Sequence, residues 1–313
     1  MAWTIYNEFH LVYFLLTVIG VTINHIALNM TDDYFDFQHS VDRARDRERN
    51  PYSGGSGMLT DGLITSGQMR RAFILCYFTT ILIGLYLTAT RGWIVLAFGV
   101  FGIACSYFYT APPVQYGYRG FGEISQLINF SFTIGMGSFF VQAQRFSWEA
   151  LLVVLPLGFM MFSMITINEI PDEEDDRSAG KLNLVARFGT KSAVWLYGFS
   201  LLLAYAIIII SPILGKTSYW IYVSLMTIPL SFKAVTILYR NYGDPLKISP
   251  ANLLTIRIHN LTGILLIAAY FIQGIVNQRN IGCIWLSLLI LVIIYFPVAL
   301  KVFVNIIPLK TEN

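Results

Sequence analysis

Apolar residues fill long blocks of this chain, and short polar stretches separate the blocks. Most blocks are about 17–25 residues long, the length of α-helix that spans the hydrocarbon layer of a bilayer. The pattern therefore predicts an all-α, polytopic membrane protein with about nine transmembrane helices. The predicted segments are residues 10–30, 72–90, 93–109, 123–144, 150–169, 191–213, 218–239, 258–277 and 281–303.

The composition supports this class and excludes a soluble domain. Hydrophobic residues make up 56% of the chain and charged residues 12%, whereas about a quarter of the residues of a soluble domain are charged. Membrane lipid is therefore an expected partner, and no nucleic-acid partner is expected.

The distribution of Lys and Arg predicts the orientation in the membrane. The loops after the first, third, fifth and seventh segments, together with the C-terminal tail, carry sixteen of the 21 Lys and Arg residues. The opposite side carries only Arg91, Arg145, Lys216 and Arg279. Positive charge accumulates on the cytoplasmic side of membrane proteins, so the first set of loops is predicted to be cytoplasmic.

Acidic residues follow the first apolar segment. Asn29, Asp32, Asp33 and Asp36 come at its end, and Asp42 and Arg43 follow. Asp32 and Asp36 are one helical turn apart and face the same way in a helix. A polar helix end in the headgroup region is the simpler interpretation. Such ends usually carry Lys, Arg, Trp and Tyr rather than three acids within five residues, which favours a functional site.

A second acidic stretch follows the segment 150–169. Asn168, Asp172 and Asp176 are spaced by four residues, so they share one face if the helix continues, and Lys181 comes soon after. Pro171 is expected to kink a longer helix. Oxygen ligands on one wall suit a hard cation such as Mg²⁺. Both acidic stretches lie on the predicted cytoplasmic side, so together they predict a site where two carboxylate walls hold Mg²⁺ and a diphosphate.

Two further stretches lie on the same predicted side. Tyr109, Tyr116 and Arg119 belong to the loop after the third segment. The two tyrosines are candidate substrate contacts, but an aromatic belt at the membrane interface also explains them. Arg119 is a candidate contact for phosphate. The long loop 37–71 has alternating charges at 42–49, which favour a short surface helix. Its glycines at 54, 55 and 57 give a backbone that can approach an anion.

From about residue 10 to 277 the chain resembles the UbiA superfamily of intramembrane prenyltransferases. Three motifs carry the resemblance in the family's order: Asp32-Asp-Tyr-Phe-Asp36 with Asp42, then Tyr109 to Glu123, then Asn168 to Lys181. The position of Asp42, the Ser-Gly-Gly-Ser-Gly segment and Tyr-Gly-Tyr-Arg-Gly look most like the 1,4-dihydroxy-2-naphthoate polyprenyltransferase branch. The resemblance implies one membrane domain over residues 1–313, folded as a helical barrel, with 281–303 as an extra C-terminal helix.

The resemblance also implies a reaction, namely transfer of a polyprenyl group from polyprenyl diphosphate to an aromatic acceptor in menaquinone-type quinone biosynthesis. The implied catalytic residues and Mg²⁺ ligands are Asp32, Asp36, Asp172 and Asp176. The implied substrate-binding residues are Asn29, Asp33, Asp42, Arg43, Tyr109, Tyr116, Arg119, Asn168 and Lys181.

The sequence departs from the family pattern in three places. Asp32 stands where the family usually has Asn, and Gly117 stands where many members have Lys. The family's usual helix before the first motif has no predicted counterpart here. Tetrapyrrole, haem and glycerol-lipid acceptors remain alternatives, and a cation-coupled transporter that uses the carboxylates is an alternative of another class.

Overall fold

The computed structural model describes residues 1–41 and 50–279, and every regular element in these ranges is helical. The elements are α1 (Ala2–Tyr6), α2 (Leu11–Gln38), α3 (Ser66–Arg91), α4 (Trp93–Phe108), η1 (Tyr116–Arg119), α5 (Gly122–Ile128), the π-helix η2 (Asn129–Met136), α6 (Gly137–Ala143), α7 (Trp148–Glu169), η3 (Ile170–Asp172), α8 (Glu173–Ser178), α9 (Leu184–Phe188), α10 (Thr190–Ile213), η4 (Tyr219–Thr227), α11 (Ile228–Asn241) and α12 (Ser249–Val276). The predicted all-α class is confirmed.

Apolar helices of membrane-spanning length dominate the described part of the chain. Seven helices there are long and apolar enough to cross a bilayer, and α4 is apolar but shorter, at 16 residues. Large side chains such as Trp195 and Phe232 remain exposed on the outer faces, where lipid accommodates them. The chain is therefore an integral membrane protein. The first eight predicted segments all correspond to apolar helices, and the ninth, 281–303, lies outside the described residues, as do Asp42, Arg43 and the predicted helix over 42–49.

Specific side chains set where several helices begin. Thr65 caps α3 in a capping box, in which its hydroxyl accepts from the Gln68 backbone N–H and the Gln68 side chain accepts from the Thr65 backbone N–H. Ser147 caps α7 by accepting from the N–H of Ala150. Gly92 ends α3 with a φ of 94°, which turns the chain directly into α4. The hairpin between α3 and α4 is therefore encoded locally.

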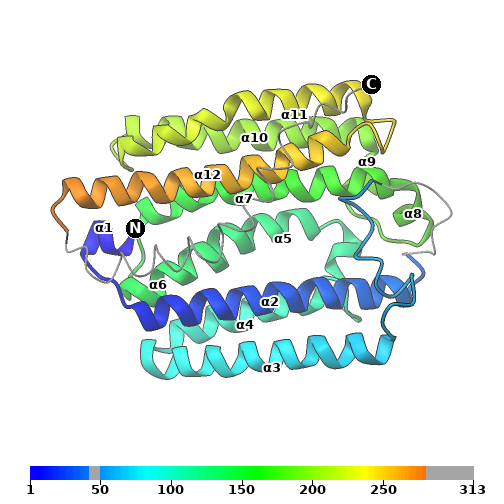
Figure 1. The fold of residues 1–313 in the computed structure, drawn as a ribbon, viewed down its shortest axis with the longest axis horizontal. Helices are drawn as coiled ribbons and strands as arrows, with labels where there is room; N and C mark the ends of the chain where they lie inside the picture. Colours follow the sequence, from blue (N-terminus) through cyan, green and yellow to red (C-terminus); the bar gives the residue numbers. More distant parts are fainter. Residues whose placement is uncertain (42–49, 280–313) are drawn as a thin grey trace, which may run out of the picture.

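The helices form two bundles that lie side by side (Figure 1). In the first bundle, α2 packs along α3 and against α4 and α6, while α4 packs against η2. In the second bundle, α7 packs along α10 and α12, and α12 packs against η4 and α11. The second bundle contains the largest buried apolar cluster, including Tyr197, Ile208, Leu238 and Ile258.

The two bundles meet along α7, which packs against α5 and η2. Glycines permit this close approach. A Cβ added at Gly158 of α7 would lie 2.6 Å from the carbonyl oxygen of Leu127, and one added at Gly135 of η2 would lie 2.8 Å from Cβ of Val154. The spacing between the bundles therefore depends on the absence of side chains at these two positions.

Candidate active site

A cavity of about 400 Å³ lies where α2 ends and α7 gives way to α8. In Figure 1 this is the end of the bundles that carries α8 and α9. Residues of both acidic stretches line it, so the structure brings together the two sets that the sequence predicted would meet. The polar side chains of its lining are Asn29, Asp32, Asp33, Asp36, Tyr52, Ser53, Ser56, Tyr109, Asn168, Glu169, Asp172, Asp175, Asp176 and Lys181.

The first wall of the cavity belongs to α2. This helix continues to Gln38, past the predicted end at residue 30, so the acids lie on the helix itself rather than after it. Asp32 and Asp36 are one turn apart and both line the cavity. Asp36 is only 5% exposed, so this carboxylate is held within the protein rather than in bulk water.

The second wall follows α7. The helix does not continue unbroken, because Pro171 lies in the 3₁₀ turn η3 between α7 and α8. Asn168, Asp172 and Asp176 nevertheless line the same cavity. Asp176 is 3% exposed, and its Oδ2 accepts a hydrogen bond of 2.7 Å from Nδ2 of Asn183.

Lys181 joins the two walls. Its Nζ lies 2.6 Å from Oδ2 of Asp36, and its backbone N–H donates to the carbonyl oxygen of Asp176 at 2.8 Å. Burial disfavours the charged ammonium, but the carboxylates of Asp36, Asp32 and Asp176 outweigh it and raise the pKa of Lys181 well above its usual value. Lys181 is therefore a cation at physiological pH and offsets the repulsion between the acids.

Two tyrosines complete the buried part of the site. The hydroxyl of Tyr118 donates to Oδ1 of Asp36 at 2.6 Å, so both oxygens of this carboxylate have partners. Tyr109 lines the cavity and is 7% exposed. Burial and, next, Asp36 raise the pKa of Tyr118, while burial and then Glu169 raise that of Tyr109. Both phenols therefore remain protonated donors at physiological pH.

The glycine-containing segment after residue 50 lies at the cavity. Residues 53–56 line it, and the Ser56 backbone N–H donates to Oδ1 of Asp33 at 3.1 Å, while the Ser56 hydroxyl donates to Oδ2. Asn50 anchors the start of the segment by donating to Oδ1 of Asn252 at 3.0 Å. Asn252 belongs to α12 and also donates to Oδ1 of Asn168 at 2.9 Å. This loop therefore connects the first wall to the second bundle.

Two of the predicted residues lie apart from the cavity lining. Arg119 is directed to the carbonyl oxygen of Pro113, to which Nη2 donates at 3.0 Å. The hydroxyl of Tyr116 donates to the carbonyl oxygen of Cys105 at 2.6 Å and accepts from Ser125. Tyr116 thus fixes the turn after α4.

Sequence reasoning did not single out Tyr118, Glu169 and Asn183 as site residues. Tyr118 stands in the loop that contains Arg119, yet nothing in the pattern shows which residue of this loop faces the acids. Glu169 is adjacent to Asn168, and Asn183 also caps α9 by accepting from the N–H of Ala186. For these residues, the only signal in the sequence was a polar side chain near a predicted site residue.

The donor set suits Mg²⁺. The cavity offers carboxylate and amide oxygens from both walls, the ligand type that hard cations prefer. Within the described ranges, no group of three or more Asp, Glu, His or Cys side chains is already gathered around a single metal position. Mg²⁺ usually keeps several waters and takes only one or two carboxylates plus substrate phosphates, so the residues present fit an ion that arrives with a diphosphate.

Comparisons with known proteins identify relatives over most of the chain. The chain is 27% identical over 230 residues to a 1,4-dihydroxy-2-naphthoate octaprenyltransferase of Bacillus subtilis, covering 74% of this chain and 72% of the relative. It is 28% identical over 267 residues to the enzyme of the same name from Escherichia coli, covering 83% and 84%. It is 24% identical to a 2-carboxy-1,4-naphthoquinone phytyltransferase of Synechocystis, covering 84% and 81%.

A solved structure supports the fold. It comes from work on digeranylgeranylglyceryl phosphate synthase in membranes, is 17% identical, covers 88% of this chain and 90% of its own, and superposes with a TM-score of 0.51. The model of the UbiA prenyltransferase family matches residues 1–261. The chain is thus a prenyltransferase rather than a transporter, and it belongs to the UbiA prenyltransferase family.

Proposed function

We propose that this prenyltransferase moves a polyprenyl group from polyprenyl diphosphate to an aromatic acceptor of the 1,4-dihydroxy-2-naphthoate type, in a Mg²⁺-dependent reaction of menaquinone-type quinone biosynthesis. One observation carries the proposal: carboxylates from two different bundles line one cavity beside a buried lysine. This arrangement suits a polyanion that binds together with divalent cations.

In this proposal Asp32 and Asp36 hold metal from the first wall, and Asp172 and Asp176 hold it from the second. When bound there, Mg²⁺ would supply Lewis-acid stabilisation of the charge that develops on the departing diphosphate. Asn29 and Asn168 add neutral oxygens to the two walls. Asp33 holds residue 56 and thereby positions the loop that borders the cavity.

Lys181 has a distinct role in the proposal. It neutralises Asp36 in the absence of substrate, and its ammonium would contact the diphosphate if Asp36 served as a ligand to bound Mg²⁺. The bond from C1 of the prenyl chain to the diphosphate oxygen then breaks, and diphosphate leaves with the bonding electrons. A ring carbon of the acceptor forms the new bond to C1 and loses the substituent it carried, as a proton or as carbon dioxide, which restores the aromatic ring. Tyr109, at the apolar side of the acids, presents an aromatic face that suits a developing allylic cation.

The choice of acceptor follows the relatives. Two of them carry the name of a 1,4-dihydroxy-2-naphthoate octaprenyltransferase, and the third is a phytyltransferase of a related naphthoquinone. We place the cavity at the cytoplasmic side, because the loops that surround it belong to the side on which Lys and Arg accumulate.

The experiment is a prenyl-transfer assay with the purified protein, Mg²⁺, radiolabelled octaprenyl diphosphate and a panel of acceptors. Formation of prenylated naphthoate product, lost on chelation and restored by Mg²⁺, is expected. Asp36→Ala and Asp172→Ala are each expected to abolish turnover without loss of folded protein. Asp244→Ala, at a partly exposed carboxylate that forms its ion pair with Lys247 and does not line the cavity, serves as the control. Product with a tetrapyrrole or glycerol-lipid acceptor but not with the naphthoate would overturn the acceptor assignment.

A further inference from the structure

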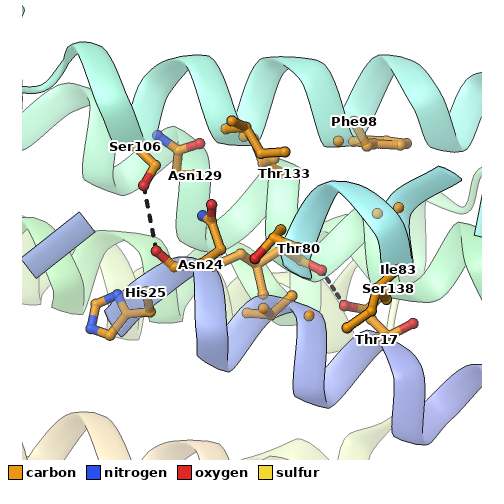
Figure 2. Close-up of a pocket in the computed structure, with 18 of the residues that line it drawn as sticks. Thr17, Asn24, His25, Thr80, Ile83, Phe98, Ser106, Asn129, Thr133 and Ser138 are labelled. Carbon is orange, nitrogen blue, oxygen red and sulfur yellow. Dashed lines mark hydrogen bonds between the residues drawn. The ribbon is translucent and has the colours of Figure 1, made fainter. Parts of the chain in front are cut away.

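A second cavity lies inside the first bundle, away from the acids. It has a volume of about 160 Å³, is partly open, and is lined by α2, α3, α4 and the continuous rod formed by α5, η2 and α6. Figure 2 shows Asn24, Thr80 and Thr133, from α2, α3 and η2, arranged around this space. Most of its lining is apolar, and five glycines contribute to it: Gly20, Gly84, Gly99, Gly102 and Gly137.

A layer of hydrogen-bonded side chains separates this cavity from the acids. The Tyr77 hydroxyl lies 2.9 Å from Oγ of Ser106 and 3.4 Å from Oγ1 of Thr31, and all three residues are buried. On α2 the lining of the inner cavity ends at Leu28 and that of the candidate active site begins at Asn29, and the two linings share no residue. Tyr77 precedes Thr80 on α3, on the side nearer the acids. The inner cavity is therefore distinct from the candidate active site.

Three polar atoms in the cavity have no partner. Oδ1 of Asn24, Oγ1 of Thr80 and Oγ1 of Thr133 are buried and make no hydrogen bond within the described part of the chain. A helical Thr ordinarily donates to the carbonyl oxygen four residues earlier, as Thr79 does to Leu75 at 2.9 Å and Thr88 does to Gly84 at 2.8 Å. An unsatisfied buried polar atom is costly, so three around one cavity indicate a missing partner.

The size of the cavity restricts that partner. An apolar cavity of about 150 Å³ in another protein stays dry and binds benzene, so a cavity of about 160 Å³ accommodates one six-membered ring. A lipid acyl chain offers nothing to the three polar atoms. A cluster of waters is disfavoured by the apolar lining. A ring hydroxyl satisfies the requirements, because it donates to an amide oxygen such as that of Asn24 and accepts from a threonine hydroxyl.

We propose that the inner cavity is a second small-molecule site that binds one phenolic ring, with the ring hydroxyl hydrogen-bonded to Asn24 Oδ1 and to the hydroxyl of Thr80. The glycines create the space for the ring. A Cβ added at Gly84 or Gly99 meets no atom within 4 Å, so larger side chains at these positions would occupy the volume that the ring takes. The proposal concerns binding and does not depend on the acceptor used in the active site.

The test measures binding of 4-fluorophenol by ¹⁹F NMR, with the purified full-length chain in lipid nanodiscs. Empty nanodiscs correct for partitioning into lipid, and fluorobenzene serves as a ring without a hydroxyl. We expect saturable binding of 4-fluorophenol that phenol displaces. Thr80→Val, which removes one hydroxyl without changing the shape, is expected to raise Kd about tenfold. Thr79→Val, at the neighbouring threonine outside the cavity, is expected to leave Kd unchanged.

Filling the cavity gives the second arm of the test. Gly99→Leu and, independently, Gly84→Leu are expected to abolish saturable binding while the protein elutes as a folded species. If either variant fails to fold, the comparison of Thr80→Val with Thr79→Val still decides. The proposal is overturned by an absence of saturable binding to the wild type, by equal affinity for fluorobenzene with no effect of Thr80→Val, or by binding that survives in the folded, filled variants.

Discussion

Lys181 offsets the repulsion between the carboxylates of the two acidic walls in the absence of substrate. Its ammonium contacts Asp36, and Asp32 and Asp176 also raise its pKa. Carboxylates this crowded repel one another unless a cation neutralises them, and the structure places a lysine beside them. Breaking a buried pair by removing one partner leaves an uncompensated charge, so the stability of this protein is expected to depend on metal once the lysine is gone.

A lysine-to-methionine exchange tests this dependence. Lys181→Met is expected to lower the free energy of unfolding by about 3–5 kcal/mol in a chelator, because Asp36 then remains buried without its cation. Thermal unfolding is measured with and without Mg²⁺, which is expected to restore part of the loss. Lys191→Met, at an exposed lysine of α10, is the control. If Lys181→Met lowered the free energy of unfolding equally with and without Mg²⁺, the result would contradict a metal position beside Asp36.

Tyr118 positions Asp36 through its hydroxyl. Tyr118→Phe is expected to reduce turnover about tenfold or more and to raise the Mg²⁺ concentration needed for half-maximal activity, because the carboxylate loses a charge-assisted hydrogen bond. The exposed Tyr239→Phe is the matched control. A drop in turnover with an unchanged Mg²⁺ requirement would contradict this role.

The Tyr118 phenol also predicts a pH dependence. Its pKa is raised in the folded state, so its contribution is fully present below the ordinary tyrosine pKa of about 10 and is lost only as the pH rises through the higher folded value. The ratio of wild-type to Tyr118→Phe turnover is therefore expected to stay constant from pH 7 to about 10. A ratio that falls across this range would show that the phenol ionises earlier.

At the scale of elements, the sequence predicted more of the helices than of the site. Eight blocks of apolar residues gave eight helices, because a bilayer span requires a minimum apolar length whatever it packs against. The ends were less predictable. α2 runs on through its acids to Gln38, and α12 begins at Ser249, before the predicted residue 258. The acids at the end of α2 line the cavity, and Asn252 near the start of α12 is buried and hydrogen-bonded to Asn168. Hydropathy alone predicts loops at both places, because these residues are polar.

The same limit applies to individual side chains. The four-residue spacing predicted that Asp32, Asp36, Asp172 and Asp176 belong to one site. All four line one cavity, although Pro171 interrupts the helix of the second wall. Spacing did not predict that Arg119 is held by the carbonyl of Pro113, or that Tyr118 rather than Tyr116 reaches Asp36. Those outcomes depend on how the loop after α4 turns, which is fixed by contacts between residues far apart in the chain.

The contact of α7 with η2 yields a prediction about packing. Gly158→Val is expected to destabilise the protein by at least about 1–3 kcal/mol, because a Cβ there meets the Leu127 carbonyl at 2.6 Å and the backbone must shift. Gly198→Val in α10 meets no atom within 4 Å with its Cβ and is the matched control. Equal unfolding temperatures for the two variants would show that the bundles tolerate separation.

At the scale of the whole molecule, the candidate active site is shared between the two bundles. Each bundle supplies one acidic wall, and Lys181, from the loop between α8 and α9, joins the two. The long loop after α2 also connects both bundles through Asn50 and Asn252. Under the proposed function, a prenyl chain that remains in lipid would present its diphosphate at one end of the molecule, where both walls would act on it together.

A metal site shared between the bundles is tested most directly by the affinity of the protein for a non-reactive prenyl thiolodiphosphate, measured with and without Mg²⁺. The account predicts that the wild type binds tightly only with Mg²⁺, and that Asp36→Asn and Asp172→Asn, one substitution in each wall, both lose this Mg²⁺-dependent binding. Asp244→Asn is expected to bind as the wild type does. Mg²⁺-dependent binding that survives the loss of either wall would contradict a metal site shared between the bundles.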